Sequence, residues 1–252
     1  MRGAQPSYRT GLLAHYPSFS LLTLPGDAQT WSVPVFMFSG DAALKTLRDP
    51  NRWTTLVRAC PLHAHWIDGE AITEVLPMGG VTDHYRRFVV DGAPVATEIL
   101  SVGDAWACTN PVNGRGISMG LMHAEGTAEV VRAHPDDPLR LACAHDAMTE
   151  TRATPWYRDT VVFDRARTAQ IVAAISGRKV PPPTDPRGAL ALAMQHDAEV
   201  FCAFLEINSL LALPQDVFAG PGVADRIMEV AAAHPAVALP CPPRDELLRL
   251  LA

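Results

Sequence analysis

The sequence has few charged residues and no concentrated basic surface. Charged residues make up 19% of its 252 positions, and 21 Lys and Arg against 27 Asp and Glu give a formal net charge of −6. The densest basic groups are Arg86-Arg87 and the pair Arg165 and Arg167. Because a nucleic-acid-binding surface has to neutralise many phosphates, this composition argues against a nucleic-acid partner.

Long hydrophobic runs and closely spaced cysteines are also missing. Charges or prolines interrupt every apolar stretch before it reaches the roughly 18 residues of a membrane span, and no signal-like core follows Arg2. No two cysteines form a CxxC pair, which disfavours a disulfide framework and a zinc ribbon. The five cysteines of the chain are Cys60, Cys108, Cys143, Cys202 and Cys241. We therefore expect a cytoplasmic protein with buried, reduced thiols and no stable membrane span.

Residue propensities predict strands in the first part of the chain. β-Branched and aromatic residues indicate five of them, over residues 19–24, 30–38, 71–76, 85–90 and 95–102. Pro25-Gly26-Asp27 and Asp91-Gly92 separate neighbouring strands and have the residue types of tight reversals. Two short helices, one ending at Leu47 and one over residues 52–59, interrupt the strands.

From Gly116 onward the pattern is helical. Apolar periodicity predicts helices over residues 117–133, 139–151, 165–175, 189–213, 223–233 and 244–251. The proline-rich residues 179–186 cannot be helical and indicate a linker or a surface crossing. The predicted fold class is mixed α/β (α+β), with antiparallel strands first and a helical C-terminal region.

The most informative segment, residues 99–121, reads ILSVGDAWACTNPVNGRGISMGL. Its apolar beginning is predicted to be a buried strand ending at Gly103-Asp104, and a polar loop then leads to a glycine-rich turn that opens a helix. There the Asp104 carboxylate is suited to accept hydrogen bonds from ligand hydroxyls. Gly114 and Gly116 let the backbone approach a ligand closely, and the helix N-terminus offers free N–H groups. The segment therefore suits a polar, partly anionic ligand.

Two other interpretations of these glycines compete. The first is a dinucleotide-binding fingerprint, formed by Gly114, Gly116 and Gly120. Its glycine spacing is one residue too long, and extra loop residues separate the strand from the glycines, so we reject this interpretation. The alternative is a strand-to-helix loop that uses glycine and proline for its turns alone.

The order and spacing of GDA at 103–105, Asn110-Pro111 and the GxG of 114–116 resemble a known cofactor motif. It is the second flavin-binding motif of the superfamily that contains p-hydroxybenzoate hydroxylase, geranylgeranyl reductase and the flavin-dependent halogenases. Met78-Gly-Gly, Arg86-Arg-Phe and Asp91-Gly-x-Pro, upstream of the motif, also fit these proteins. The resemblance implies an FAD-dependent oxidoreductase with a partial FAD-binding fold.

The resemblance also implies a role for each motif residue. Gly103 and Asp104 would bind the ribityl and pyrophosphate side of FAD, and Pro111 would line the loop facing the isoalloxazine ring. The backbone N–H groups directed at the pyrimidine edge of the flavin would come from Gly114, Arg115, Gly116 and Ile117. There the helix dipole would stabilise the negative charge of reduced flavin.

The implied chemistry is that of a monooxygenase or a reductase acting on a small organic substrate, with NAD(P)H or a partner protein as reductant. The family often has a histidine shortly after GDA, whereas Trp106 and Ala107 stand there, so the catalytic residues are unknown. Trp31-Ser-Val-Pro resembles half of the halogenase WxWxIP signature, but Gln29 replaces its first tryptophan, which disfavours halogenation.

Members of this superfamily begin with a strand, GxGxxG and a helix that bind the ADP half of FAD, and nothing before residue 99 has that form. The chain is expected to cover the latter half to two-thirds of such an enzyme, as a truncated frame, half of a split gene or a domain that lost catalysis. A separate N-terminal FAD-binding chain would complete it, and without that chain we expect exposed apolar surface and a tendency to self-associate. The alternative function is a non-catalytic, flavoprotein-derived binding or interaction domain.

Three parts are expected on this basis. Residues 1–76 would hold substrate-domain strands and helices, residues 77–135 the flavin-contacting strand, loop and helix, and residues 136–252 the helical C-terminal region.

Short histidine patterns also occur at His63-Ala-His65, His145-Asp146 and His196-Asp197, and the last two resemble those of metal-dependent phosphohydrolases. None has the further ligands that a metal centre requires, so a structural role is favoured and no metal is expected.

Overall fold

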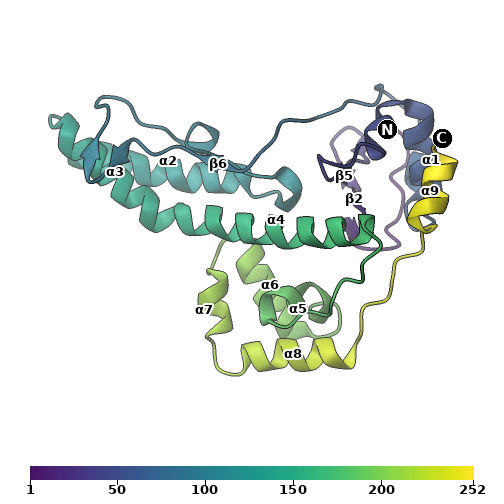
Figure 1. Ribbon diagram of the computed structural model, residues 1–252. Coiled ribbons are helices and arrows are strands. Elements are labelled where there is room, and N and C mark those ends of the chain that lie inside the picture. The colour runs from purple at the N-terminus through teal and green to yellow at the C-terminus, as the bar shows by residue number, and fades with distance from the viewer. The chain divides into compact units, whose positions relative to one another are not determined.

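The computed structural model describes all 252 residues, which form two compact units (Figure 1). The first comprises Met1–Gly79, Ala166–Pro181 and Val237–Ala252, and the second Gly80–Arg165 and Pro182–Ala236. Nine α-helices and short antiparallel strands confirm the predicted mixed α/β class, whereas the partial FAD-binding fold and the three-part division stay predictions. None of the helices combines the length and apolar character needed to cross a membrane.

The first unit is built on a small antiparallel sheet. Its strands, in spatial order, are β1 (Leu13–His15), β2 (Phe19–Leu22) and β5 (Val35–Met37). β3 (Leu24–Pro25) and β4 (Trp31–Ser32) form a second pair, closed by the Pro-Gly-Asp turn. The predictions of strands over 19–24 and 30–38 and of a reversal between them are confirmed.

Helices from both ends of the chain pack in this unit. α1 (Pro50–Arg58) begins two residues earlier than predicted, because Asp49 caps it by accepting hydrogen bonds from the next two free N–H groups. The helix predicted to end at Leu47 is the 3-10 turn η1 (Leu44–Arg48), and η2 (Ala64–Ile67) follows α1. α9 (Arg244–Leu250) lies beside α1 (Figure 1). Their shared core includes Tyr16, Phe19, Leu56, Trp66 and Leu247.

The second unit contains a helical hairpin of α2 (Gly116–Ala133) and α3 (Pro138–Arg152), which lie side by side (Figure 1). A Cβ on Gly126 of α2 would lie 2.5 Å from Met148 Sδ of α3, so this glycine permits the close contact of the two helices. The helix predictions over 117–133 and 139–151 are confirmed. α4 (Thr154–Ile175) begins well before the predicted residue 165 and contributes residues to both units.

Two short β-pairs accompany the hairpin. β6 (His84–Tyr85) pairs with β9 (Ala107–Cys108), and β7 (Val89–Val90) pairs with β8 (Ala93–Pro94), all antiparallel. Asp91 and Gly92 both have a left-handed backbone, with φ of 50° and 78°, as a two-residue hairpin turn requires. The predicted hairpin at Asp91-Gly92 is therefore confirmed.

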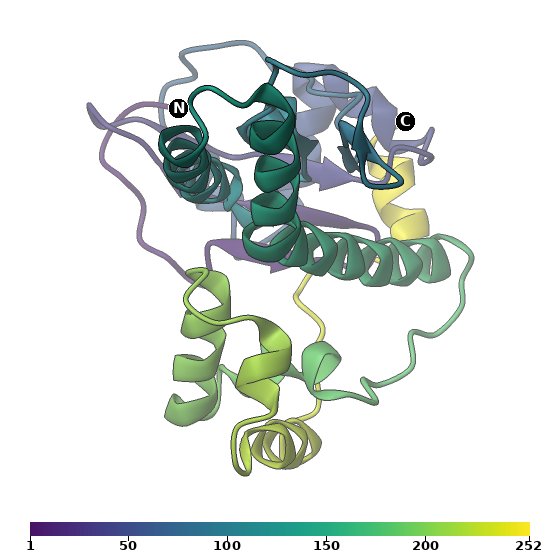
Figure 2. The same cartoon turned by 90° about the vertical axis from the view of Figure 1, so that its left-hand side faces the viewer.

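Four short helices complete the second unit and cluster together in Figure 2. They are α5 (Pro186–Ala193), α6 (Ala198–Asn208), α7 (Pro214–Phe218) and α8 (Val223–Ala233). The single helix predicted over 189–213 is wrong. Asp197 interrupts it, because its carboxylate accepts hydrogen bonds from the N–H groups of Glu199 and Val200 and so begins α6.

The strands predicted over residues 71–76 and 95–102 are also wrong. Both segments are mostly exposed and pair with no other strand, and Glu98 interrupts the second with a φ of 62°. The segment before Gly103, expected to be a buried strand, leaves Ile99 50% exposed. β-Branched residues favour a pleated, half-buried surface, and without a pairing strand these segments remain irregular.

Replacing Gly126 with valine should destabilise the α2–α3 hairpin by about 1–3 kcal/mol, because the added side chain would overlap Met148. Chemical denaturation followed by circular dichroism measures the change. Gly79→Val is the control, since a Cβ at that glycine would have no heavy atom within 4 Å and should leave stability nearly unchanged. Equal stabilities of the two variants would contradict the close packing.

Candidate functional site

The segment singled out in the sequence forms two short turns followed by α2. Gly103–Ala105 make the 3-10 turn η3, and Pro111–Asn113 make η4. Gly103 has a φ of 58°, a left-handed conformation in which a side chain would be strained. A Cβ on Gly103 would lie 3.8 Å from Gly120 Cα, so η3 rests directly on α2. The structure thus brings Gly103 and Asp104 next to the first turns of α2.

The N-terminus of α2 is open. Gly114 adopts the left-handed conformation that turns the chain into the helix, and Arg115 at the N-cap position provides no side-chain cap. The first helical hydrogen bond is donated by Met119 N to Arg115 O, so the N–H groups of residues 116–118 have no acceptor within the protein. A Cβ on Gly114 or Gly116 would have no heavy atom within 4 Å. Free donors and the positive helix end therefore face unobstructed space.

The Arg115 side chain points inward, away from this opening. Its Nη1 donates to Asp159 Oδ2 of α4 at 2.9 Å, and only 11% of the side chain is exposed. Arg187, at the start of α5, pairs with the other oxygen of the same carboxylate. Asp159 therefore ties the beginning of α2 to two other helices. Sequence reasoning missed Asp159 and Arg187, because no local pattern connects them with the motif.

The loop before α2 is anchored by two aspartates. Asn110 donates from its backbone N to Asp83 at 3.0 Å and from Nδ2 to Asp164 at 3.0 Å, while its Oδ1 accepts from Val112 N. Burial, and next the hydrogen bond and negative charge of Asp83, raise the pKa of Asp164 to about 7, although Asn110 opposes the shift. The second oxygen of Asp164 is buried without a hydrogen-bond partner. No local pattern in the sequence connects either aspartate with the motif.

Of the remaining predicted site residues, Asp104 is the most available to a ligand. Its side chain is exposed and forms no hydrogen bond or ion pair, since Arg86 contacts only the backbone oxygens of Asp104 and Ala105. Pro111 is exposed in η4, and Ile117 is 82% exposed in the first turn of α2. The structure therefore leaves one carboxylate free beside α2, in the turn that lies against Gly120.

α2 also has an uncovered apolar face. Ile117, Leu121 and Val131 lie on this side and are 82%, 68% and 41% exposed, and the intervening Ala124 is exposed as well. The opposite side is buried against α3 through Met119, His123 and Gly126. A helix that is apolar on two sides is normally covered on both. The outer face of α2 is therefore an unpartnered surface.

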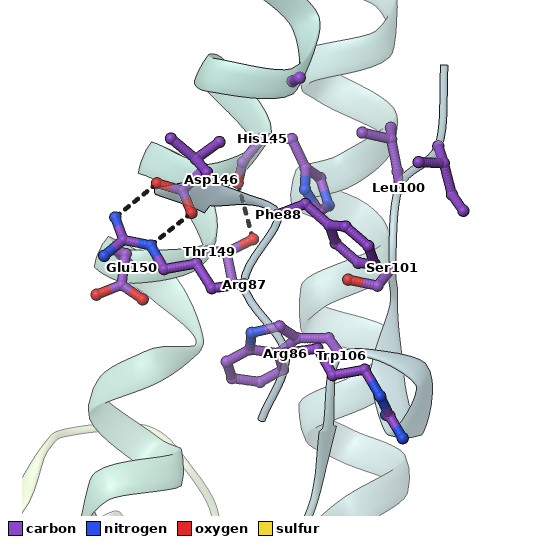
Figure 3. Close-up of a pocket in the computed structure, with 13 residues that line it drawn as sticks. Arg86, Arg87, Phe88, Leu100, Ser101, Trp106, His145, Asp146, Thr149 and Glu150 are labelled. Carbon is purple, nitrogen blue, oxygen red and sulfur yellow. Dashed lines mark hydrogen bonds and ion pairs between the residues drawn. The ribbon is translucent and has the colours of Figure 1, made fainter. Parts of the chain in front are cut away.

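A small cavity lies on the other side of the motif, between α3 and the segments around Phe88 and Leu100 (Figure 3). Its volume of about 20 Å³ holds little more than a water molecule. Arg87 closes one edge by donating two hydrogen bonds to Asp146, at 2.8 and 2.7 Å. The cavity is thus too small for an organic ligand.

Trp106 and two histidines form a buried cluster beneath this cavity. Trp106 is 4% exposed and stacks edge-on against His123, whose Nε2 bonds to Thr149 Oγ1 at 2.9 Å. Burial, followed by the neighbouring His145, lowers the pKa of His123 to about 4, and burial also lowers that of His145. Both rings are therefore neutral packing elements at neutral pH. Nowhere in the chain do three His, Cys, Asp or Glu side chains gather in a group that could hold a metal ion.

Comparison of the chain with models of known protein families gives no match, and comparison with curated proteins gives none either. The motif residues and their geometry therefore carry the functional inference.

The Asp83–Asp164 pair should make stability fall as the pH rises. The folded chain holds a proton on Asp164 up to about pH 7, whereas the unfolded chain releases it near its ordinary pKa of about 4. Between pH 4 and pH 7, roughly, the folded state binds more protons than the unfolded state, so each rise in pH favours unfolding. Asp164→Asn keeps the hydrogen bonds without titrating. It should be more stable than the wild type at pH 8 by about 1–2 kcal/mol, after allowance for solvent screening.

Urea denaturation of both proteins at pH 5 and pH 8 measures this effect. Asp91→Asn, in the exposed hairpin turn, is the control and should follow the wild-type profile. Parallel pH profiles for wild type and Asp164→Asn would contradict the raised pKa of Asp164.

Proposed function

We propose that this chain is the flavin-contacting part of an FAD-dependent oxidoreductase, related to p-hydroxybenzoate hydroxylase, geranylgeranyl reductase and the flavin-dependent halogenases. The observation that carries the proposal is the open N-terminus of α2. It follows a left-handed Gly114, and Gly103, next to the free carboxylate of Asp104, lies against Gly120 on the same helix. This is the arrangement that the motif resemblance implies.

The residues present fit an FAD molecule. Gly114 and Gly116 leave space in which the edge of a flat ring can approach the backbone, and the free N–H groups of residues 116–118 can donate to its carbonyl oxygens. The positive helix end favours negative charge on the bound group. Asp104, with no partner of its own, can accept hydrogen bonds from ribityl or neighbouring hydroxyls.

When bound, FAD would carry electrons from NAD(P)H or a partner protein to a small organic substrate, in monooxygenase or reductase chemistry. The chain's own residues would bind and orient the flavin. The side chains of Arg115, Asp159 and Arg187 would hold the helix end in position and would not touch the ligand. Trp106 is buried and supplies no acid or base.

The uncovered face of α2 supports the proposal that a partner binds beside this site. Ile117 and Leu121 lie on the helix that carries the flavin donors, so a segment covering them is well placed to hold the rest of FAD. We propose that an ADP-binding segment, separate from these 252 residues, packs on this face. The same exposed face favours one alternative, a flavoprotein-derived interaction domain without catalysis.

Purified alone, the chain should be colourless or hold flavin only weakly. No GxGxxG segment for the ADP pyrophosphate occurs in its sequence, and those contacts should provide much of the binding free energy of FAD. Absorption spectroscopy of the purified protein measures bound flavin. A stoichiometric yellow protein without a co-purifying partner would contradict this prediction.

When an ADP-binding segment from the superfamily is supplied as a second chain, Asp104→Ala should weaken FAD binding by roughly one to two orders of magnitude. Charge-assisted hydrogen bonds of this kind are worth about 1.5–3 kcal/mol, and about 1.4 kcal/mol changes the dissociation constant tenfold. Asp104→Asn should fall in between. Gly116→Val should also weaken binding, because its side chain would fill the open space.

Isothermal titration calorimetry measures these dissociation constants. Asp91→Asn is the matched control for Asp104→Asn, because it removes a carboxylate from a remote turn whose left-handed backbone asparagine tolerates. The same dissociation constant for the wild type and Asp104→Ala would refute the role of Asp104.

A further inference from the structure

Two cysteines that are far apart in the sequence lie in contact in the first unit. Cys60 directly follows α1, Cys241 precedes α9, and their sulfur atoms are 3.9 Å apart across a separation of 181 residues. Cys60 is fully buried, while Cys241 is half-buried. The other cysteines, Cys108, Cys143 and Cys202, belong to the second unit.

Noncovalent contacts hold the two sulfur atoms together. Leu247 and Leu251 of the C-terminal segment are buried in the same apolar cluster as Cys60, and Leu239 and Cys241 pack against it. Arg244 Nη2 pairs with the buried Asp41 at 2.8 Å. The segment is therefore docked before any covalent bond forms, and the two sulfur atoms have to approach from 3.9 Å to the roughly 2 Å of a disulfide.

The surroundings distinguish the two thiols. The hydrogen bond with Cys241, and next burial, raise the pKa of Cys60, whereas the same hydrogen bond lowers the pKa of Cys241. The Tyr16 hydroxyl, which bonds to His63 Nδ1 at 2.9 Å, lies beside Cys60. Cys241 is thus both the more accessible and the more acidic thiol, the properties of the sulfur that reacts first.

We propose that Cys60 and Cys241 form a dithiol site that low-molecular-weight disulfides of the glutathione type oxidise to an intramolecular disulfide. The Cys241 thiolate attacks one sulfur of the small disulfide, forms a mixed disulfide and releases one thiolate. The Cys60 sulfur then attacks Cys241 Sγ, and the second small thiolate leaves with the Cys60 proton. Two protein thiols become one disulfide, and one small disulfide is reduced to two thiols. The new bond joins the C-terminal segment to the end of α1.

The test uses the full chain, reduced and then incubated with glutathione disulfide. Peptide mapping by mass spectrometry without reductant should find the Cys60 and Cys241 peptides joined, with the loss of two hydrogens. The melting temperature should rise by about 5–10 °C, because closing so long a loop removes much entropy from the unfolded chain. A reductant should reverse both changes.

Cys241→Ser and Cys202→Ser are the matched variants. After oxidation, Cys202→Ser should keep the joined peptides and the rise in melting temperature, and Cys241→Ser should lose both. The peptide map of the wild-type chain tests the proposal even if a variant folds poorly. Cys60 and Cys241 recovered unjoined, as thiols or as separate glutathione adducts, would overturn the proposal.

Discussion

A carboxylate between two guanidinium groups fixes the beginning of α2. Asp159 is 8% exposed and pairs with Arg115 at the helix start and with Arg187 of α5. Replacing Asp159 with a neutral residue would leave the buried Arg115 guanidinium without its charge partner, at a cost of about 3–5 kcal/mol. The Arg115 side chain is held in this ion pair and does not cover the helix opening, and its guanidinium has no acceptor with which to cap the N–H groups. The free N–H groups of α2 therefore keep a defined direction.

The candidate site follows from this constraint. Asn110 and the two aspartates that it contacts hold the preceding loop, Gly114 turns the chain, and η3 brings Asp104 against the same helix. The result is a set of donors and one free acceptor on a rigid support. A flavin with its ribityl chain offers both acceptors and hydroxyls, which is why it suits this geometry. The uncovered apolar side of α2 fits the same proposal, since a segment holding the other half of FAD would bury it.

Local signals predicted much of the fold. The periodicity of α2 and α3, the Asp91-Gly92 hairpin and the strands around Pro25-Gly26-Asp27 all depend on neighbouring residues, and all were found. The strands predicted over 71–76 and 95–102 failed because β-propensity takes effect only where a pairing strand exists. Long-range partners were not predictable: Asp159 and Asp164 reach the motif from α4, and the Cys60–Cys241 contact spans most of the chain.

The central claim is that flavin binds at the N-terminus of α2, and amide chemical shifts test it most directly. In an NMR titration of the isotope-labelled chain with FMN, which needs no ADP-binding segment, the amides of Gly116, Ile117 and Ser118 should shift most. The chemical shifts of the amides at the N-terminus of another helix, α8, should stay unchanged. Shifts confined to residues outside η3, η4 and the first turn of α2, or no shifts at millimolar FMN, would contradict the account.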